Sequence, residues 1–242
     1  MIIFITCTYK RPGRLPFIQR HIDNIFSKID DYRWILIEDG GEIDPELTSL
    51  ISGLNVDYRC LGPTRDKGNA QRNMALSMVK EARLDGVIYN MDDDNLVRTE
   101  LCPELRKVDR VAVFPVGNIG PGGLERPIIR HGKIVGWNAG WDSRKFPVDM
   151  GGFAFPSKLL FDLTPPIWTH SGVGGETEFL ERLVASPDEI DVSLCDGNRK
   201  CYVFHNEPLD PIHATLLHMR KRIKALLSVK TYTRALYRYR ET

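Results

Sequence analysis

The sequence has little that would direct it into or across a membrane, and no cysteine pattern that would define a disulfide framework or a zinc site. Residues 1–6 are apolar, but Lys10 and Arg11 follow closely, and the run is far shorter than a signal-peptide core or a membrane helix. The five cysteines are an odd number without a CxxC pair, which favours free thiols in a reducing compartment. We therefore expect a cytoplasmic protein.

An excess of charge of one sign is also missing. The chain has 33 Lys and Arg against 32 Asp and Glu, a formal net charge of +1. This balance argues against a nucleic-acid binder, which would need a strongly basic surface.

Basic residues nevertheless gather at the C-terminal end. Eight Lys or Arg lie between His213 and the end of the chain, against the single acid Glu241. Apolar residues recur there at three- to four-residue spacing, which predicts a basic amphipathic helix in a tail of residues 211–242. Such a helix would lie on an anionic membrane surface, peripheral to the inner membrane, or would pack on the rest of the protein. The sequence leaves both options open.

Residues 1–110 alternate short apolar runs with amphipathic helical patterns. This alternation predicts an α/β fold, a mainly parallel sheet flanked by helices. With 242 residues the chain has room for one such domain and the tail, and we expect the domain to cover residues 1–210. The predicted strands are 2–6, 34–37, 56–61 and 87–91, and the predicted helices are 15–29, 46–52 and 69–82.

Residues 111–210 differ in composition. They are richer in glycine, proline and tryptophan, and their helical periodicity is weaker. They form a second half of the same predicted domain. Its expected elements are strands at 111–116, 133–137 and 201–204, a glycine-rich loop at 117–123 and a helix at 176–185.

Polar side chains stand where the predicted parallel strands end. Thr8 and Tyr9 follow the first strand, Asp39 follows the second, and residues 92–94 follow the fourth. In open α/β sheets, ligands bind beyond the carboxyl ends of the strands. The sequence therefore predicts a ligand site at this edge of the sheet.

Residues 92–94 are three successive aspartates, the most informative stretch of the chain. Adjacent carboxylates repel one another unless a cation or hydrogen-bond donors compensate them, and hard divalent ions such as Mn²⁺ or Mg²⁺ prefer such oxygen ligands. Alternate residues of a strand point in opposite directions, so we expect one metal ligand, one ribose contact and one structural acid. A solvated acidic turn that caps the next helix is the alternative.

Two cations lie near the start of the third predicted helix. Lys67 and Arg72 flank Gly68 there, and helix N-termini with neighbouring cations favour phosphate. Asp39 is placed to accept a hydrogen bond from the edge of a base. For Arg72, an ordinary position on the helix surface remains an alternative.

At this point the sequence resembles a known family. Six motifs occur in the order seen in glycosyltransferase family 43, the β-1,3-glucuronyltransferases, over roughly residues 3–207. They are TCTY at 6–9, KGNAQRNMAL at 67–76, YNMDDDN at 89–95, GWNAGW at 136–141, DMGGFA at 149–154 and ETEFL at 176–180.

The resemblance implies a GT-A fold, a UDP-sugar donor, Mn²⁺ (or Mg²⁺) and an inverting single displacement. Residues 1–110 would then be the nucleotide-binding half and residues 111–210 the acceptor-binding half. Glu176 matches the family's catalytic base and Asp94 its direct metal ligand. The expected donor contacts are Thr8, Tyr9, Asp39, Lys67, Arg72, Asp92, Asp93 and His205, and the expected acceptor contacts are Glu125, Trp141 and Asp149.

Three positions depart from the family pattern. Cys7 replaces a proline, Lys67 stands where an arginine is expected, and Glu207 replaces a basic residue. Lysine keeps the charge of arginine but loses its bidentate fork. The loss of cationic partners on the donor side argues against a carboxylated sugar such as glucuronate.

The function that we expect is transfer of a sugar to a carbohydrate or lipid-linked glycan acceptor, in the synthesis of a cell-surface polysaccharide or lipopolysaccharide. Relatives also suggest a homodimer. One alternative is a nucleotidyltransferase, but the glycine-rich loop expected after the first strand is reduced to the single Gly13 in residues 7–14. The other alternative is a non-catalytic glycan-binding module.

Overall fold

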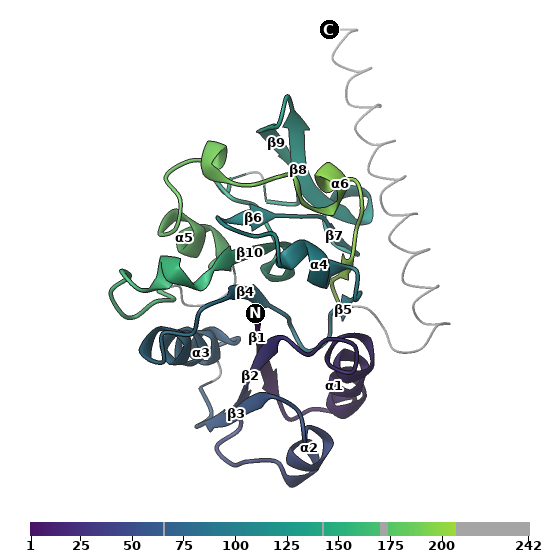
Figure 1. Ribbon diagram of the computed structural model, residues 1–242, viewed down its shortest axis with the longest axis vertical. Helices are drawn as coiled ribbons and strands as arrows, with labels where there is room; N and C mark the ends of the chain where they lie inside the picture. Colours follow the sequence, from purple (N-terminus) through teal and green to yellow (C-terminus); the bar gives the residue numbers. More distant parts are fainter. Residues whose placement is uncertain (65, 142, 170–173, 207–242) are drawn as a thin grey trace, which may run out of the picture.

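The apolar runs of the first half form the centre of a six-stranded sheet. The computed structural model describes residues 1–64, 66–141, 143–169 and 174–206 (Figure 1). The strand order in this sheet is β3-β2-β1-β4-β10-β6, and the first four strands are parallel. Their bounds are β1 Ile2–Tyr9, β2 Tyr32–Asp39, β3 Val56–Leu61, β4 Val87–Asn90, β6 Ala112–Val113 and β10 Phe153–Pro156.

Strand register brings the polar strand ends together. β1 pairs with β2 from Ile2 opposite Tyr32 to Tyr9 opposite Asp39. β4 pairs with β1 on the other side and ends at Asn90, just before the three aspartates. The carboxyl ends of these three strands therefore meet at one edge of the sheet.

Both faces of the central parallel strands β1, β2 and β4 are buried, as expected for a sheet of this type, whereas the edge strand β3 is partly exposed. Ile2 and Phe4 of β1 face one apolar cluster, which includes side chains of the first helix, α1 (Arg14–His21). Ile3 and Ile5 face the other cluster, which includes side chains of α3 (Asn69–Glu81). A third helix of this half, α2 (Pro45–Leu50), begins with Asp44 as its N-cap.

The second half adds two strands to this sheet and supplies four of the five strands of a smaller sheet beside it. β10 is antiparallel to both β4 and β6. The smaller sheet has the order β5-β11-β7-β8-β9, and its hairpin β8–β9 stands out from the rest of the protein (Figure 1). Its bounds are β5 Leu96–Val97, β7 Val116–Gly117, β8 Leu124–Arg130, β9 Lys133–Asn138 and β11 Val203–Phe204.

The other three α-helices are short. They are α4 Leu101–Leu105, α5 Glu176–Glu181 and α6 Leu194–Asn198, together with single 3₁₀ turns at Pro121–Gly123, Met150–Gly152, Ser157–Leu160 and Pro187–Glu189. Across the described residues, no helix is both long enough and apolar enough to cross a membrane.

The predicted α/β class, with a sheet flanked by helices, is confirmed. Several boundaries are corrected. The single strand expected at 111–116 is two strands in different sheets, β6 and β7, separated by Pro115, which has no N–H to donate to a ladder. The smaller sheet, mostly antiparallel, was not predicted. The predicted tail of residues 211–242 lies outside the described residues.

Three predicted helices and strands are longer than those observed. The helix expected at 15–29 is α-helical only to His21 and continues as a π-helical turn, Ile22–Phe26. The helix expected at 176–185 ends at Glu181, and the strand expected at 201–204 is reduced to Val203–Phe204. Apolar periodicity located these elements but did not mark where their hydrogen bonding stops.

Candidate active site

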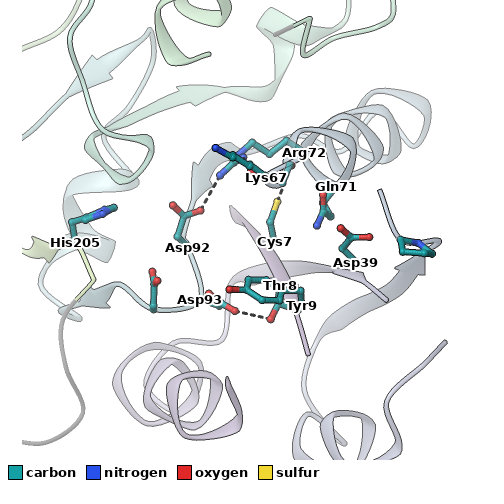
Figure 2. A pocket seen from close by; sticks show the side chains of 13 residues that line it. Cys7, Thr8, Tyr9, Asp39, Lys67, Gln71, Arg72, Asp92, Asp93 and His205 are labelled. Carbon is teal, nitrogen blue, oxygen red and sulfur yellow. Dashed lines mark hydrogen bonds and ion pairs between the residues drawn. The ribbon is translucent and has the colours of Figure 1, made fainter. Parts of the chain in front are cut away.

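A cleft of about 590 Å³ opens at the carboxyl ends of β1, β2 and β4, beside the start of α3 (Figure 2). It gathers residues that are widely separated in the sequence. Its lining consists of Cys7, Thr8, Tyr9, Asp39, Pro63, Lys67, Gly68, Gln71, Arg72, Asp92, Asp93, Asp94 and His205. All of the predicted donor contacts and the predicted metal ligand therefore line one cleft.

Asp93 is the most fully bonded of the three aspartates. Thr8 Oγ1 donates to its Oδ2 at 2.6 Å, and the two terminal nitrogens of Arg11 donate to its two oxygens, each also at 2.6 Å. The Arg11 guanidinium also lies 4.7 Å from the centre of the Tyr9 ring. Arg11 thus holds the carboxylate of Asp93 and the ring of Tyr9 in place, a role that the sequence did not reveal.

Asp92 and Asp94 are less fully compensated. Arg72 Nη2 lies 3.2 Å from Asp92 Oδ1, but burial outweighs this contact and raises the pKa of Asp92 to about 6. Burial and the negative charge of Asp93 raise the pKa of Asp94. The charges of His205 and of Arg11, which lies 4.0 Å from Asp94, oppose this rise only in part. The side chain of Asp94 is the most exposed of the three. Asp94 is therefore the carboxylate best placed to take a further ligand.

Two side chains of α1 bind the backbone of residues 92–94, the aspartate loop. Arg20 Nη2 donates to the carbonyl oxygen of Asp94 at 2.8 Å, and His21 Nε2 donates to that of Asp92 at 3.1 Å. Burial lowers the pKa of His21 to about 4, so its ring is neutral and carries its proton on Nε2. Neither residue was singled out from the sequence, because their partners lie more than 70 residues away.

The donor set fits a hard divalent ion only if the substrate completes it. Within the part of the chain that the structure describes, no group of three or more His, Cys, Asp or Glu side chains is arranged to hold a metal. Mg²⁺ and similar ions commonly bind through one or two carboxylates, with water and substrate phosphates as the other ligands. One carboxylate from Asp94 at the mouth of the cleft is compatible with that mode.

The start of α3 folds Arg72 into the cleft. Lys67 and Gly68 both have left-handed backbone angles, with φ of 60° and 89°. A Cβ on Gly68 would lie 2.8 Å from Arg72 Nη1, so a glycine is required for this close approach. Arg72 is buried, donates to the carbonyl oxygen of Lys67 and faces the ring of Trp168 at 5.6 Å. It is not an ordinary cation on a helix surface.

Asp39 lies at the opposite end of the cleft from His205 (Figure 2). Its two oxygens accept hydrogen bonds from the backbone N–H and the hydroxyl of Thr64, at 2.7 and 3.0 Å. Tyr9 pairs with it across β1 and β2 and is half exposed. An open aromatic ring beside a fixed carboxylate provides a stacking surface and a hydrogen-bond acceptor for a base.

A second, smaller cleft of about 230 Å³ adjoins the first. Four residues line both clefts: Lys67, Arg72, Asp92 and His205. The other residues that line the second cleft are Asn69, Ile119, Trp141, Arg144, Val148, Asp149, Met150, Trp168, Gly174, Gly175 and Glu176.

Glu176 begins α5 on the wall of this second cleft. Arg144 Nη2 lies 2.5 Å from its Oε2, and Arg144 also donates to the carbonyl oxygen of Gly174 and to the hydroxyl of Thr177. The guanidinium lies 5.7 Å from the ring of the half-exposed Trp141. Arg144, which the sequence did not single out, thus fixes Glu176 beside Trp141.

Asp149 and Glu125 form the deep part of this region. His205 Nδ1 lies 3.0 Å from Asp149 Oδ2, an ion-pair distance without good hydrogen-bond alignment. Glu125 is only 3% exposed and lies behind the cleft, where its Oε1 accepts from the backbone N–H of Asp149. Burial, followed by the charge of Asp149, raises the pKa of Glu125 to about 7. Among the predicted acceptor contacts, Trp141 and Asp149 line the second cleft and Glu125 supports it.

The protonation state of His205 can be tested directly. Asp149 raises the pKa of His205 to about 9, so the ring carries a positive charge at neutral pH. Its contribution to folding is complete below the ordinary histidine pKa and is lost as the pH rises through about 9. We expect NMR titration to give a midpoint near 9 for His205 and a value well below that in Asp149→Asn. A midpoint near 6.5 for His205 in the unaltered protein would contradict the ion pair.

Known proteins share sequence similarity with most of this chain. The sequence profile of glycosyltransferase family 43 matches residues 22–207. Galactosylgalactosylxylosylprotein 3-beta-glucuronosyltransferase P of Drosophila melanogaster is 30% identical over 219 residues, which cover 85% of this chain and 45% of the fly protein. Galactosylgalactosylxylosylprotein 3-beta-glucuronosyltransferase 2 of Mus musculus is 32% identical over 223 residues, which cover 84% of this chain and 68% of the mouse protein. The chain thus spans about half to two thirds of the length of these relatives.

A solved structure supports the fold independently. TarS residues 1–349 of S. aureus match with a TM-score of 0.55 at 13% identity, over 91% of this chain and 64% of that one. At this identity the likeness concerns the fold alone, and it confirms the predicted GT-A architecture. The profile match and the sequence relatives together show that the chain belongs to glycosyltransferase family 43.

Proposed function

We propose that this protein is an inverting glycosyltransferase that moves a sugar from a UDP-sugar to a carbohydrate acceptor, with Glu176 as the general base. One observation carries the proposal. The cleft lined by the three aspartates and the cleft lined by Glu176 share the walls formed by Lys67, Arg72, Asp92 and His205. A sugar at this junction would have the nucleotide site on one side and a carboxylate on the other.

This placement matches the chemistry of inversion. In a single displacement, the acceptor hydroxyl attacks the anomeric carbon from the side opposite the leaving group, and a base takes its proton. Arg144 holds Oε2 of Glu176, which leaves Oε1 to face the acceptor hydroxyl. The bond to UDP breaks as the new glycosidic bond forms, and the proton passes to Glu176.

Charge develops on the leaving diphosphate, and the junction is rich in groups that would stabilise it. Arg72 and Lys67 contribute cations, and the Asp149 carboxylate keeps His205 protonated. We propose that Asp94 binds Mn²⁺ or Mg²⁺ together with the diphosphate, and that the ion supplies further charge stabilisation when bound. Asp93, locked by Arg11, would accept from a ribose hydroxyl, and Tyr9 and Asp39 would contact the base.

The identity of the sugars is part of the proposal. The names of the relatives specify a glucuronosyl donor and a galactosylgalactosylxylosylprotein. Lys67 in place of the expected arginine favours a donor other than glucuronate, and Glu207 lies outside the described residues. We propose an acceptor glycan of a cell-surface polysaccharide or lipopolysaccharide, and a cytoplasmic enzyme that is dimeric and peripheral to the inner membrane. The proposed membrane contact of residues 211–242 also lies outside the described part of the chain.

The test of the proposal is release of UDP from a panel of UDP-sugars, with Mn²⁺ or EDTA present. We expect metal-dependent release from one donor, and Glu176→Gln should lower it by at least about 100-fold because a general base contributes about that much. UDP affinity should not fall, because Glu176 lies in the second cleft and its negative charge repels the diphosphate.

Two outcomes would replace the proposal. Release of pyrophosphate from a nucleoside triphosphate and a sugar phosphate would indicate a nucleotidyltransferase. Tight glycan binding that is indifferent to Glu176→Gln, without release from any donor, would indicate a binding module.

The metal assignment can be tested through binding alone. We expect Asp94→Asn to abolish the enhancement of UDP affinity by Mn²⁺, measured by calorimetry, because it removes the carboxylate that lacks a close protein partner. Asp23→Asn, at an exposed aspartate that lines neither cleft, is the matched control. Undiminished Mn²⁺-dependent UDP binding by Asp94→Asn would show that the metal is held elsewhere.

The role of Arg11 gives a further prediction. Arg11→Lys keeps the positive charge but loses the two parallel bonds to Asp93, and charged hydrogen bonds contribute about 1.5–3 kcal/mol each. We expect the Kd for UDP to rise about tenfold or more, as measured by calorimetry. The neighbouring exposed Lys10→Gln should leave it unchanged. Equal affinity in Arg11→Lys and the unaltered protein would show that the orientation of Asp93 does not limit nucleotide binding.

A further inference from the structure

The hairpin β8–β9 exposes aliphatic side chains far from the nucleotide cleft. Ile128 is 44% exposed and Val135 is 55% exposed. They account for two of the six large hydrophobic residues that are exposed in the described part of the chain. The opposite side of the hairpin packs on the protein, where Ile129 and Ile134 contact the second apolar cluster. The exposed pair is therefore not needed to fill a core.

Cations surround this pair. Residues 126–141 contain Arg126, Arg130 and Lys133 but no Asp or Glu. Lys133 reaches Asp188 at 3.4 Å, with both side chains largely exposed. Arg126 and Arg130 are exposed, and within the described residues neither has an ion-pair partner. Their charge is left to attract a partner in solution.

A groove of about 650 Å³ runs beside the hairpin. Its lining includes the apolar Pro127, Ile128 and the partly buried Ile129, together with two arginines, Arg126 and Arg199. Arg199 is ion-paired with Asp196 at 3.0 Å, so Arg126 supplies the uncompensated charge. Asn138, Gly197 and Asn198 complete the lining. The groove thus continues the pattern of the hairpin face, in which apolar groups lie between cations.

Protection of a sheet edge explains only part of this pattern. β9 is the last strand of the smaller sheet, and edge strands commonly carry Lys or Arg and a bulge to discourage pairing with other chains. The register does shift beside Ile128, so Ile129 pairs with Ile134 and Val135 is skipped. A protected edge, however, would not place an exposed aliphatic side chain on each strand.

We propose that the β8–β9 hairpin docks the protein on an anionic phospholipid bilayer. Ile128 and Val135 would enter the interface between headgroups and acyl chains, while Arg126 and Arg130 would contact lipid phosphates. A second copy of the chain is a poor occupant, because its own hairpin would bring the same positive charges. Residues 207–242 are also basic and would be repelled from this face.

The hairpin connects this surface to the second cleft. Glu125, behind that cleft, is the second residue of β8, and Trp141, on its wall, follows three residues after β9 ends. From Glu125 to Arg130 the strand rises about 17 Å. If the proposed function holds, a docked enzyme would receive an acceptor whose reacting sugar stands at about this height, which suits a lipid-linked oligosaccharide rather than a single sugar on lipid.

The docking proposal is tested without donor or acceptor, so it stands or falls independently of the transferase activity. The full chain would be sedimented with vesicles of phosphatidylcholine alone or mixed with phosphatidylglycerol. We expect binding only to the mixed vesicles. Because each cation near an anionic surface contributes about fivefold, Arg126→Gln with Arg130→Gln should lower the partition coefficient about 25-fold. Ile128→Ser with Val135→Ser should lower it by a similar or larger factor.

The controls are Ile43→Ser and Arg59→Gln, which change an exposed aliphatic residue and an exposed cation on the nucleotide-binding half. Neither should alter vesicle binding. Unchanged binding of both hairpin double variants would overturn the proposal and assign any vesicle binding to another part of the chain. Conversion of a dimer to a monomer by Ile128→Ser with Val135→Ser, with vesicle binding unchanged, would overturn it in favour of an interface between copies.

Discussion

Three adjacent aspartates at the end of β4 are the constraint on which the architecture of the site depends. Carboxylates this close oppose folding unless each receives a compensating partner. The protein supplies a bidentate arginine to Asp93, a more distant arginine to Asp92 and little to Asp94. The raised pKa values of Asp92 and Asp94 show that the compensation is incomplete. The excess negative charge of this site favours the binding of a cation. Because the three aspartates are compensated to different degrees, identical side chains have different roles.

The supporting structure follows from this constraint. α1 does more than cover one face of the sheet, because Arg20 and His21 fix the carbonyl groups of the aspartate loop. The left-handed turn at Lys67 and Gly68 folds Arg72 back toward Asp92. These contacts come from the two helices that pack on opposite faces of the parallel strands. The packing that stabilises the core therefore also sets the geometry of the cleft.

The features of the fold and the site that could be predicted from the sequence are those that local patterns determine. The strand at 56–61 and the site residues Thr8, Tyr9, Asp39 and 92–94 were predicted because apolar runs end in polar groups at the edge of a parallel sheet. His205, which lines the same cleft, was expected only from the family resemblance. Arg11 and Arg144 were missed, because their partners lie 82 and 32 residues away and no local pattern reveals such pairs. The insertion of β10 between β4 and β6 was missed for the same reason. The break at Pro115, in contrast, is predictable from the sequence, because proline has no N–H to donate to a strand ladder.

The junction of the two clefts explains why this arrangement suits transfer better than binding alone. Arg72 interacts electrostatically with both Asp92 and Glu176, so one buried cation influences the donor side and the acceptor side together. An added diphosphate would compete with these carboxylates for Arg72. A binding module gains nothing from setting a carboxylate, even one paired with Arg144, opposite an anionic ligand, because the two repel. A transferase needs that carboxylate, since it must accept a proton as negative charge builds on the departing diphosphate.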